Sequence, residues 1–144
     1  MMRSLIVSAF FAALSVSAQA APAQIAITGG WIRAIPGGVP AGGYFVLRNN
    51  GDKPVTLTGA ASPGCGMLML HKSEDMSGME QMTDVPKIDV PAHGTLTFAP
   101  GGYHLMCMEP RAQIKPGNTV PVTFAFADGT QATANFTVRG ATGK

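Results

Sequence analysis

The sequence predicts an all-β fold, a sandwich or barrel of short strands. Apolar and polar residues alternate in short runs along most of the chain, which is the pattern of strands with one buried face. Turn-forming residues interrupt these runs about every 8 to 12 residues, as is typical of sandwiches and barrels. No segment keeps the period of an amphipathic helix over three turns.

The expected strands follow one another along the chain. The segment "GGYFVLRNNGDKPVTLTGA" has two β-rich runs joined by "NNGDKP", and "GMLMLH" follows the break at Pro63 and Gly64. The segment "GTLTFAPGGYHLMCM" has two runs separated by "PGG". The segment "TVPVTFAFADGTQATANFTVR" alternates on both sides of Asp128-Gly129, a strong hairpin signal. Residues 73–78 are the least strand-like part, and we expect a loop there.

The N-terminus predicts a cleaved signal peptide over residues 1–20. Arg3 precedes an apolar stretch from about Leu5 to Val16, and small residues lead up to a cleavage site after Ala20. The apolar stretch is shorter than the roughly 20 residues that span a bilayer, and no later segment is long and apolar enough to insert stably. We therefore expect one domain over residues 21–144, exported to the periplasm.

Charge and motif content exclude several functions. The formal net charge is +2 with no basic run, so nothing predicts nucleic-acid binding. A blue-copper electron carrier needs a His downstream of its thiolate, and no His follows Cys107. A copper-zinc dismutase needs more than the three histidines present, and no Ser or Cys motif supports a hydrolase. We expect a protein that is not an enzyme.

Methionine and histidine gather in two of the expected strands, "MLMLH" and "HLMCM". Strand alternation places residues 67, 69 and 71 on one face and Leu68 and Leu70 on the other. It likewise places residues 104, 106 and 108 opposite Leu105 and Cys107. Each strand thus has an aliphatic face for the core and a Met/His face that can meet its counterpart at one edge of the fold.

Thioether sulfur is a soft, uncharged ligand that selects Cu(I), and imidazole also suits copper. Zinc sites use thiolate, imidazole or carboxylate instead. A Met/His set without carboxylate therefore indicates copper, with Cu(I) preferred and Cu(II) as the alternative oxidation state. Neutral thioethers need no deprotonation, although sulfoxide formation would damage them.

The spacing is more specific. Ten residues separate His71 from Met82, 21 separate Met82 from His104, and one separates His104 from Met106. This H-x10-M-x21-H-x-M pattern resembles the motif of the periplasmic copper chaperone family PCu(A)C. The segments "AGGYFVLRNNGDKPVTLTGAASP", "VPAHGTLTFAPGGYHLM" and "PGNTVPVTFAFADG" are similar to that family's framework.

The resemblance implies a cupredoxin-like Greek-key β-sandwich that carries copper for cytochrome c oxidase assembly, with His71, Met82, His104 and Met106 as the Cu(I) ligands. We expect the chain to be a monomer. It implies subunit II of the oxidase, or a Sco-type assembly protein, as the partner. Two alternatives stay open. The chain could buffer or sequester copper without delivering it, or it could be a protein-interaction module without metal transfer.

The chain departs from the plainer family pattern in its additional methionines. We expect Met67 and Met69 to pack beside the site, since Met fills irregular gaps well, and Met108 to lie near it without binding the ion. Met76 and Met79 are either auxiliary ligands or solvated residues of the expected loop. His93, in "PAHGT", is expected to be solvated.

The two cysteines, Cys65 and Cys107, allow one intramolecular bond. An oxidising compartment favours a disulfide. The alternative is two free thiols, with Cys107 acting as a small buried hydrophobe.

Overall fold

The computed structural model describes residues 24–144, and this part of the chain consists of strands and turns without a helix. The predicted signal peptide, residues 1–20, lies outside the described residues. Within residues 24–144 no helix has the length and apolar character needed to cross a membrane. The ten strands are β1 (Ile25–Arg33), β2 (Ala41–Asn49), β3 (Val55–Ala61), β4 (Cys65–Met76), β5 (Met79–Asp84), β6 (Ile88–Val90), β7 (Thr95–Phe98), β8 (Tyr103–Pro110), β9 (Thr119–Phe126) and β10 (Gln131–Arg139).

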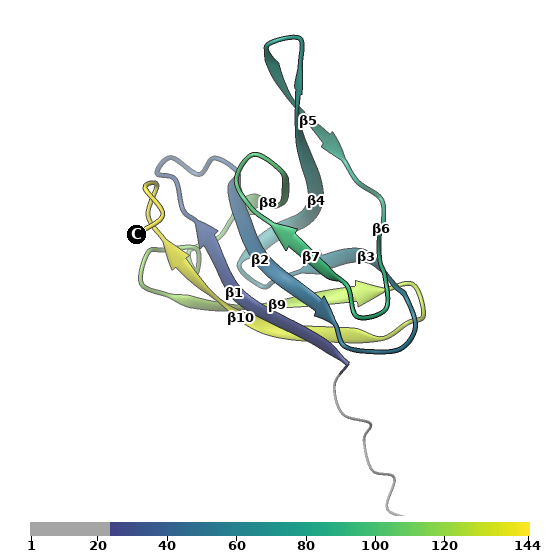
Figure 1. The fold of residues 1–144 in the computed structure, drawn as a ribbon. Coiled ribbons are helices and arrows are strands. Elements are labelled where there is room, and N and C mark those ends of the chain that lie inside the picture. Colours follow the sequence, from purple (N-terminus) through teal and green to yellow (C-terminus); the bar gives the residue numbers. More distant parts are fainter. Residues whose placement is uncertain (1–23) are drawn as a thin grey trace, which may run out of the picture.

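The strands form one continuous sheet in the order β5-β4-β8-β2-β1-β10-β9-β3-β6, with β7 added beside β2. β1 and β10 run parallel, and the other paired strands run antiparallel. The sheet bends over itself, so that β3 and β9 face β2 and β7 across a shared interior (Figure 1). The hairpin of β4 and β5 projects from one end of this body (Figure 1). The all-β prediction is confirmed.

Aromatic side chains fill the interior between the two halves of the sheet. The ring of Phe45 on β2 lies 4.4 Å from that of Phe98 on β7 and 4.7 Å from that of Phe124 on β9, measured between centroids. Such tilted contacts add to the free energy of burying the rings. The aliphatic faces of β4 and β8 join this core through Leu68, Leu70, Leu105 and Cys107. Core packing thus determines which face of β4 and β8 points outward.

All of the expected strands are present, but β5 and β6 were not predicted from the sequence, and neither was β1. The two glycines in its middle, Gly29 and Gly30, weaken the strand pattern. The structure places a register shift there, between Thr28 and Trp31. Gly29 has a φ of +64°, and a Cβ on Gly30 would lie 2.5 Å from the ring of Phe136. The glycines therefore let the strand bulge and let a core ring pack against its backbone.

The prediction of a loop over residues 73–78 is wrong. β4 continues to Met76, and a two-residue turn of Ser77 and Gly78 leads into β5. Both turn residues have positive φ, 60° and 81°, as in the tight turns that match strand twist. The Asp75 carboxylate accepts a hydrogen bond of 3.0 Å from the Gly78 amide. The polar composition reflects an exposed hairpin, whose strands need no apolar face.

The hairpin predicted around Asp128-Gly129 is confirmed by the antiparallel pairing of β9 and β10. The amide and hydroxyl of Thr130 both donate to the Asp128 carboxylate, at 2.9 and 2.6 Å. These hydrogen bonds lower the pKa of Asp128, because they stabilise its charged form. This local side-chain contact stabilises the turn that Asp128-Gly129 predicted.

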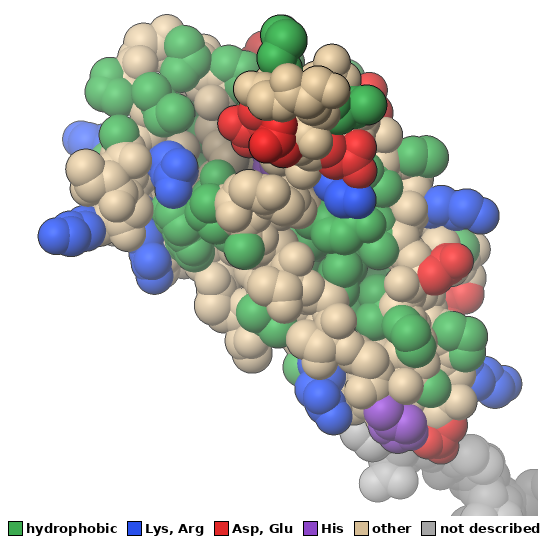
Figure 2. Space-filling model, turned by 45° about the horizontal axis from the view of Figure 1, so that its top comes forward, with side chains coloured by type: hydrophobic (Ala, Val, Ile, Leu, Met, Phe, Trp, Pro, Cys, Tyr) green, Lys and Arg blue, Asp and Glu red, His purple; other side chains and the backbone are tan. Residues whose placement is uncertain are grey.

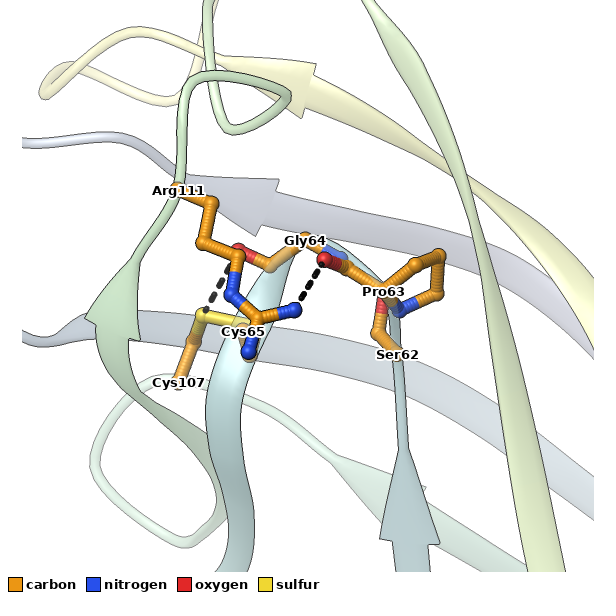
Figure 3. Close-up of a disulfide and its surroundings, with 6 residues drawn as sticks. All are labelled: Ser62, Pro63, Gly64, Cys65, Cys107 and Arg111. Atoms are coloured by element: carbon orange, nitrogen blue, oxygen red, sulfur yellow. Dashed lines mark hydrogen bonds between the residues drawn. A yellow bond between two sulfur atoms is a disulfide. The ribbon is translucent and has the colours of Figure 1, made fainter.

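A disulfide joins Cys65, the first residue of β4, to Cys107 in β8 (Figure 3). Their Cα atoms are 5.4 Å apart, and both residues are buried. Arg111 holds the adjacent turn, because its guanidinium donates to the Pro63 carbonyl at 3.1 Å and its amide to the Gly64 carbonyl at 2.9 Å. Of the two states that the sequence left open, the structure contains the bridged one. The bond ties together the two strands that carry the Met/His faces.

We predict that replacing both cysteines, Cys65→Ala with Cys107→Ala, lowers the free energy of unfolding by about 3–4 kcal/mol. The bond spans 42 residues, and the chain-entropy model assigns it a stabilisation of that size. Urea denaturation followed by tryptophan fluorescence measures the change. A reductant should destabilise the wild type by a similar amount and leave the double variant unaffected. Equal stability of oxidised wild type and variant would contradict the prediction.

Candidate metal centre

The pairing of β4 with β8 brings the two predicted histidine ligands together. His71 is the direct cross-strand partner of His104, and Met69 is the partner of Met106. The two imidazole rings lie 5.6 Å apart between centroids and are nearly perpendicular, at 81°. Directly paired residues project from the same face of a sheet, so these four side chains share one face. Leu68 and Leu105 are buried on the other, as alternation predicts.

β5 brings the third strand to this face. Met82 is paired with Ser73 of β4, and Asp84 is paired with His71. Met82 is therefore the diagonal neighbour of His71, a separation that a long side chain can bridge. Three adjacent strands thus present all four predicted ligands on one face of the sheet. Met82 is the accessible member, with 57% of its surface exposed.

The imidazole of His104 is buried and held in one orientation. Its Nδ1 lies 3.2 Å from the Gly102 carbonyl oxygen, which can only accept a hydrogen bond. Nδ1 is therefore the protonated nitrogen of the neutral ring, and Nε2 keeps its lone pair. Nε2 is buried without a hydrogen-bond partner. Metal-binding histidines characteristically have one nitrogen fixed by a carbonyl or carboxylate and the other free for the ion.

His71 is also mostly buried, with 14% of its side chain exposed. The Asp84 carboxylate approaches its Nε2 to 2.6 Å, although the contact lacks the direction of a hydrogen bond, so neither ring nitrogen is hydrogen-bonded. Asp84 itself is 72% exposed, so its side chain has room to move. The carboxylate is a neighbour that sequence reasoning missed, because only the β4–β5 register places it beside the ring.

An open cavity of about 270 Å³ lies at this face, and three of the predicted ligands, Met82, His104 and Met106, line it. His71 lies outside the lining, directly across from His104. The wall also includes Arg33, Tyr44 and Glu80, none of which the sequence singled out. Gly42 belongs to the same wall, and a Cβ there would lie 2.7 Å from the Tyr44 hydroxyl. The glycine therefore leaves the space that this hydroxyl occupies.

The additional methionines fall into two groups. Met67 is paired with Met108 on the same face as the histidines, next to the pair of Met69 and Met106. Met76 and Met79 are paired with each other beside the turn, and strand alternation places them on the opposite face of the hairpin from Met82. Both are more than half exposed. Of the two readings of Met76 and Met79, the register favours solvated residues.

His93 is separate from this face. It lies in the turn before β7 with a φ of 58°, and its Nε2 is 2.9 Å from the carboxylate of Asp52. Its side chain is 60% exposed. The expectation of a solvated histidine is confirmed.

The sequence that forms this site matches a known protein family. Residues 25–138 match the family described as "Putative lipoprotein LpqE-like". The chain belongs to this family. Among curated proteins it is 31% identical over 106 residues, 73% of its length, to "Putative lipoprotein Lxx21020" of Leifsonia xyli subsp. xyli. The chain spans 53% to 63% of the length of the curated relatives it matches.

Solved structures show the same fold as this LpqE-like chain. The copper-bound PCuAC domain from PmoF2 matches with a TM-score of 0.66 and 24% identity over 84% of this chain and 97% of that domain. The Cu(I) form of DR1885 from Deinococcus radiodurans matches with a TM-score of 0.62 and 35% identity over 85% of this chain and 81% of that chain. The family assignment to PCuAC and the cupredoxin-like β-sandwich are both confirmed.

We predict that metal-free His104 is the tautomer protonated at Nδ1, because the Gly102 carbonyl accepts from that nitrogen. Long-range proton–nitrogen correlation spectra of nitrogen-15-labelled protein at neutral pH should show one such tautomer. His93, which is exposed and lies beside a carboxylate instead, is the internal comparison. A His104 ring protonated at Nε2 would contradict the arrangement described above.

Proposed function

We propose that this LpqE-like chain is an exported, non-enzymatic copper carrier that binds Cu(I). Its ligands are His71, Met82, His104 and Met106. The observation that carries the proposal is the buried, unpartnered Nε2 of His104, a residue that lines the same cavity as Met82 and Met106. A buried polar atom without a partner costs about 1–3 kcal/mol. A bound ion that accepts this lone pair would offset that cost.

The chemistry of the surrounding groups supports copper over other metals. Two thioethers beside two imidazoles form a soft, neutral ligand set, which suits Cu(I) better than Zn(II) or Ca(II). Within residues 24–144 no group of three His, Cys, Asp or Glu side chains is arranged to hold a metal ion. Both cysteines belong to the disulfide, so thiolates are not part of the set.

The relatives support the same proposal. Two of the matched structures contain copper, and one of them is the Cu(I) form. The family description names lipoproteins, a class of exported proteins, which agrees with the signal peptide proposed for residues 1–20. We propose the periplasm as the compartment in which the carrier acts.

Unequal exposure of the ligands suggests how the ion leaves. His104 is 4% exposed and lies on a central strand, whereas Met82 is 57% exposed on the outermost strand. An acceptor can therefore replace the bond between copper and the Met82 sulfur before the imidazoles release the ion. Each step exchanges one ligand for another, so copper keeps its oxidation state. The proposed acceptor is subunit II of cytochrome c oxidase, directly or through a Sco-type protein whose thiolates bind Cu(I) more strongly.

We predict that Met82→Leu and Met106→Leu each weaken Cu(I) binding by more than about tenfold, since even residues that only orient ligands contribute 10- to 100-fold. Leucine keeps the apolar volume, so the fold should be preserved. Competition with a Cu(I) chelator measures the affinity. Met79→Leu is the matched control, because Met79 lies on the same strand as Met82 but on the other face. Equal losses at residues 79 and 82 would reject the assigned ligand set.

A second experiment separates delivery from buffering. We expect the Cu(I)-loaded protein, mixed with the metal-free copper domain of subunit II, to lose its copper to that domain. Metal analysis after separation of the two proteins shows which one holds the ion. A parallel mixture with a metal-free Sco-type domain tests the indirect route. If copper stays on the carrier in both mixtures, the chain buffers copper and the delivery proposal fails.

A further inference from the structure

Four methionines form two neighbouring cross-strand pairs on the face that carries the histidines. Met69 is paired with Met106. Met67 is paired with Met108, and this is the next pair of side chains on the same face of the two strands. Directly opposed Cβ atoms are about 4.5–5.5 Å apart in an antiparallel pair. Successive pairs on one face are about 7 Å apart along the strands. We call these four residues, Met67, Met69, Met106 and Met108, the thioether ladder.

Core packing does not account for the ladder. Met67 is 59% exposed, and the other three residues are partly exposed. The interior beneath them is already filled by the aliphatic side chains on the opposite face, including Leu68 and Cys107. β5 pairs with β4 only from His71 onward, so no described strand covers the edge beside Met67 and Met69. Met67 therefore lies largely in solvent, and the other three thioethers are only partly covered by the protein.

We propose that Met67, Met69 and Met108 form a second binding site for Cu(I). Three thioethers offer three soft, neutral donors, which is a ligand set for a monovalent copper ion. Methionine has three rotatable side-chain bonds, so sulfurs from two opposed strands can converge on an ion between them. Met106 stands between the two sites, since it is paired with Met69 and shares the cavity with His104. The ladder thus gives the ion an entry point directly beside the histidine site, on the same face of β4 and β8.

This second site goes beyond the proposed function, because it needs neither His71 nor His104. Its donors are neutral thioethers alone, so we expect it to bind more weakly than the site that also contains imidazoles. An ion on the ladder can move to the histidine site by exchanging one thioether for another at Met106. Copper keeps its oxidation state, and no bond other than metal–ligand bonds forms or breaks.

The test is a titration of the metal-free protein, labelled with carbon-13 at the methionine methyl groups, with Ag(I) as the redox-stable analogue of Cu(I). We expect Met82 and Met106 to shift with the first equivalent, and Met67, Met69 and Met108 with the second. In the double variant Met67→Leu with Met108→Leu, the second step should disappear. A Cu(I) chelator competition on the same proteins should show a fall from two bound equivalents to one.

Two further variants make the outcome decisive. Met76→Leu with Met79→Leu removes the same number of thioethers from the opposite face of the hairpin, and it should keep both equivalents. His71→Ala with His104→Ala should lose the first site and keep the shifts of Met67 and Met108, so failure of the carrier proposal is distinguishable from failure of this one. The inference is overturned if wild type binds one equivalent only. It is equally overturned if both methionine double variants lose metal alike.

Discussion

The antiparallel register of β4 and β8 is the constraint on which the face carrying the four candidate ligands depends. It sets Leu68 opposite Cys107, and by the same pairing it sets His71 opposite His104. Because side chains alternate with a period of two, one register determines which side chains are buried and which lie on the outer face. A slip by one residue would expose the leucines and bury the thioethers. Burial of Leu70 and Leu105 and the bond between Cys65 and Cys107 oppose such a slip.

The different exposure of the candidate ligands follows from where the strands lie in the sheet. β8 is interior to the sheet, so His104 is buried and its Nδ1 is held by Gly102, whereas β5 is at the edge and Met82 is exposed. Under the proposed function, the buried imidazole would retain the ion and the exposed thioether would be the group that an acceptor reaches first. Acidic side chains also gather around the β4–β5 hairpin (Figure 2). Glu80 and Asp84 belong to this hairpin, and their negative potential favours the approach of a cation.

The strand pairing also divides the methionines beyond the family spacing into two groups. The thioether ladder is continuous with the face of His71 and His104, whereas Met76 and Met79 lie on the other side of the hairpin. Position relative to the sheet, rather than proximity in sequence, therefore separates the two groups. Met82 is three residues from Met79, yet the two point in opposite directions.

The sequence by itself determined the all-β class, the hairpin at Asp128-Gly129 and the Met/His and aliphatic faces of β4 and β8, because alternation and turn residues are local properties. Its spacing pattern also selected the four candidate ligands. It did not reveal β1, β5 or β6, nor the strand pairing of residues 73–76. In β1 the absence of a side chain at Gly30 leaves room for the ring of Phe136, a contact that only the folded chain shows. Only the tertiary structure placed Asp84 beside His71 and freed Nε2 of His104. The register of β4 and β5 decides the first, and the burial of His104 in β8 decides the second, so residue type alone could not reveal either.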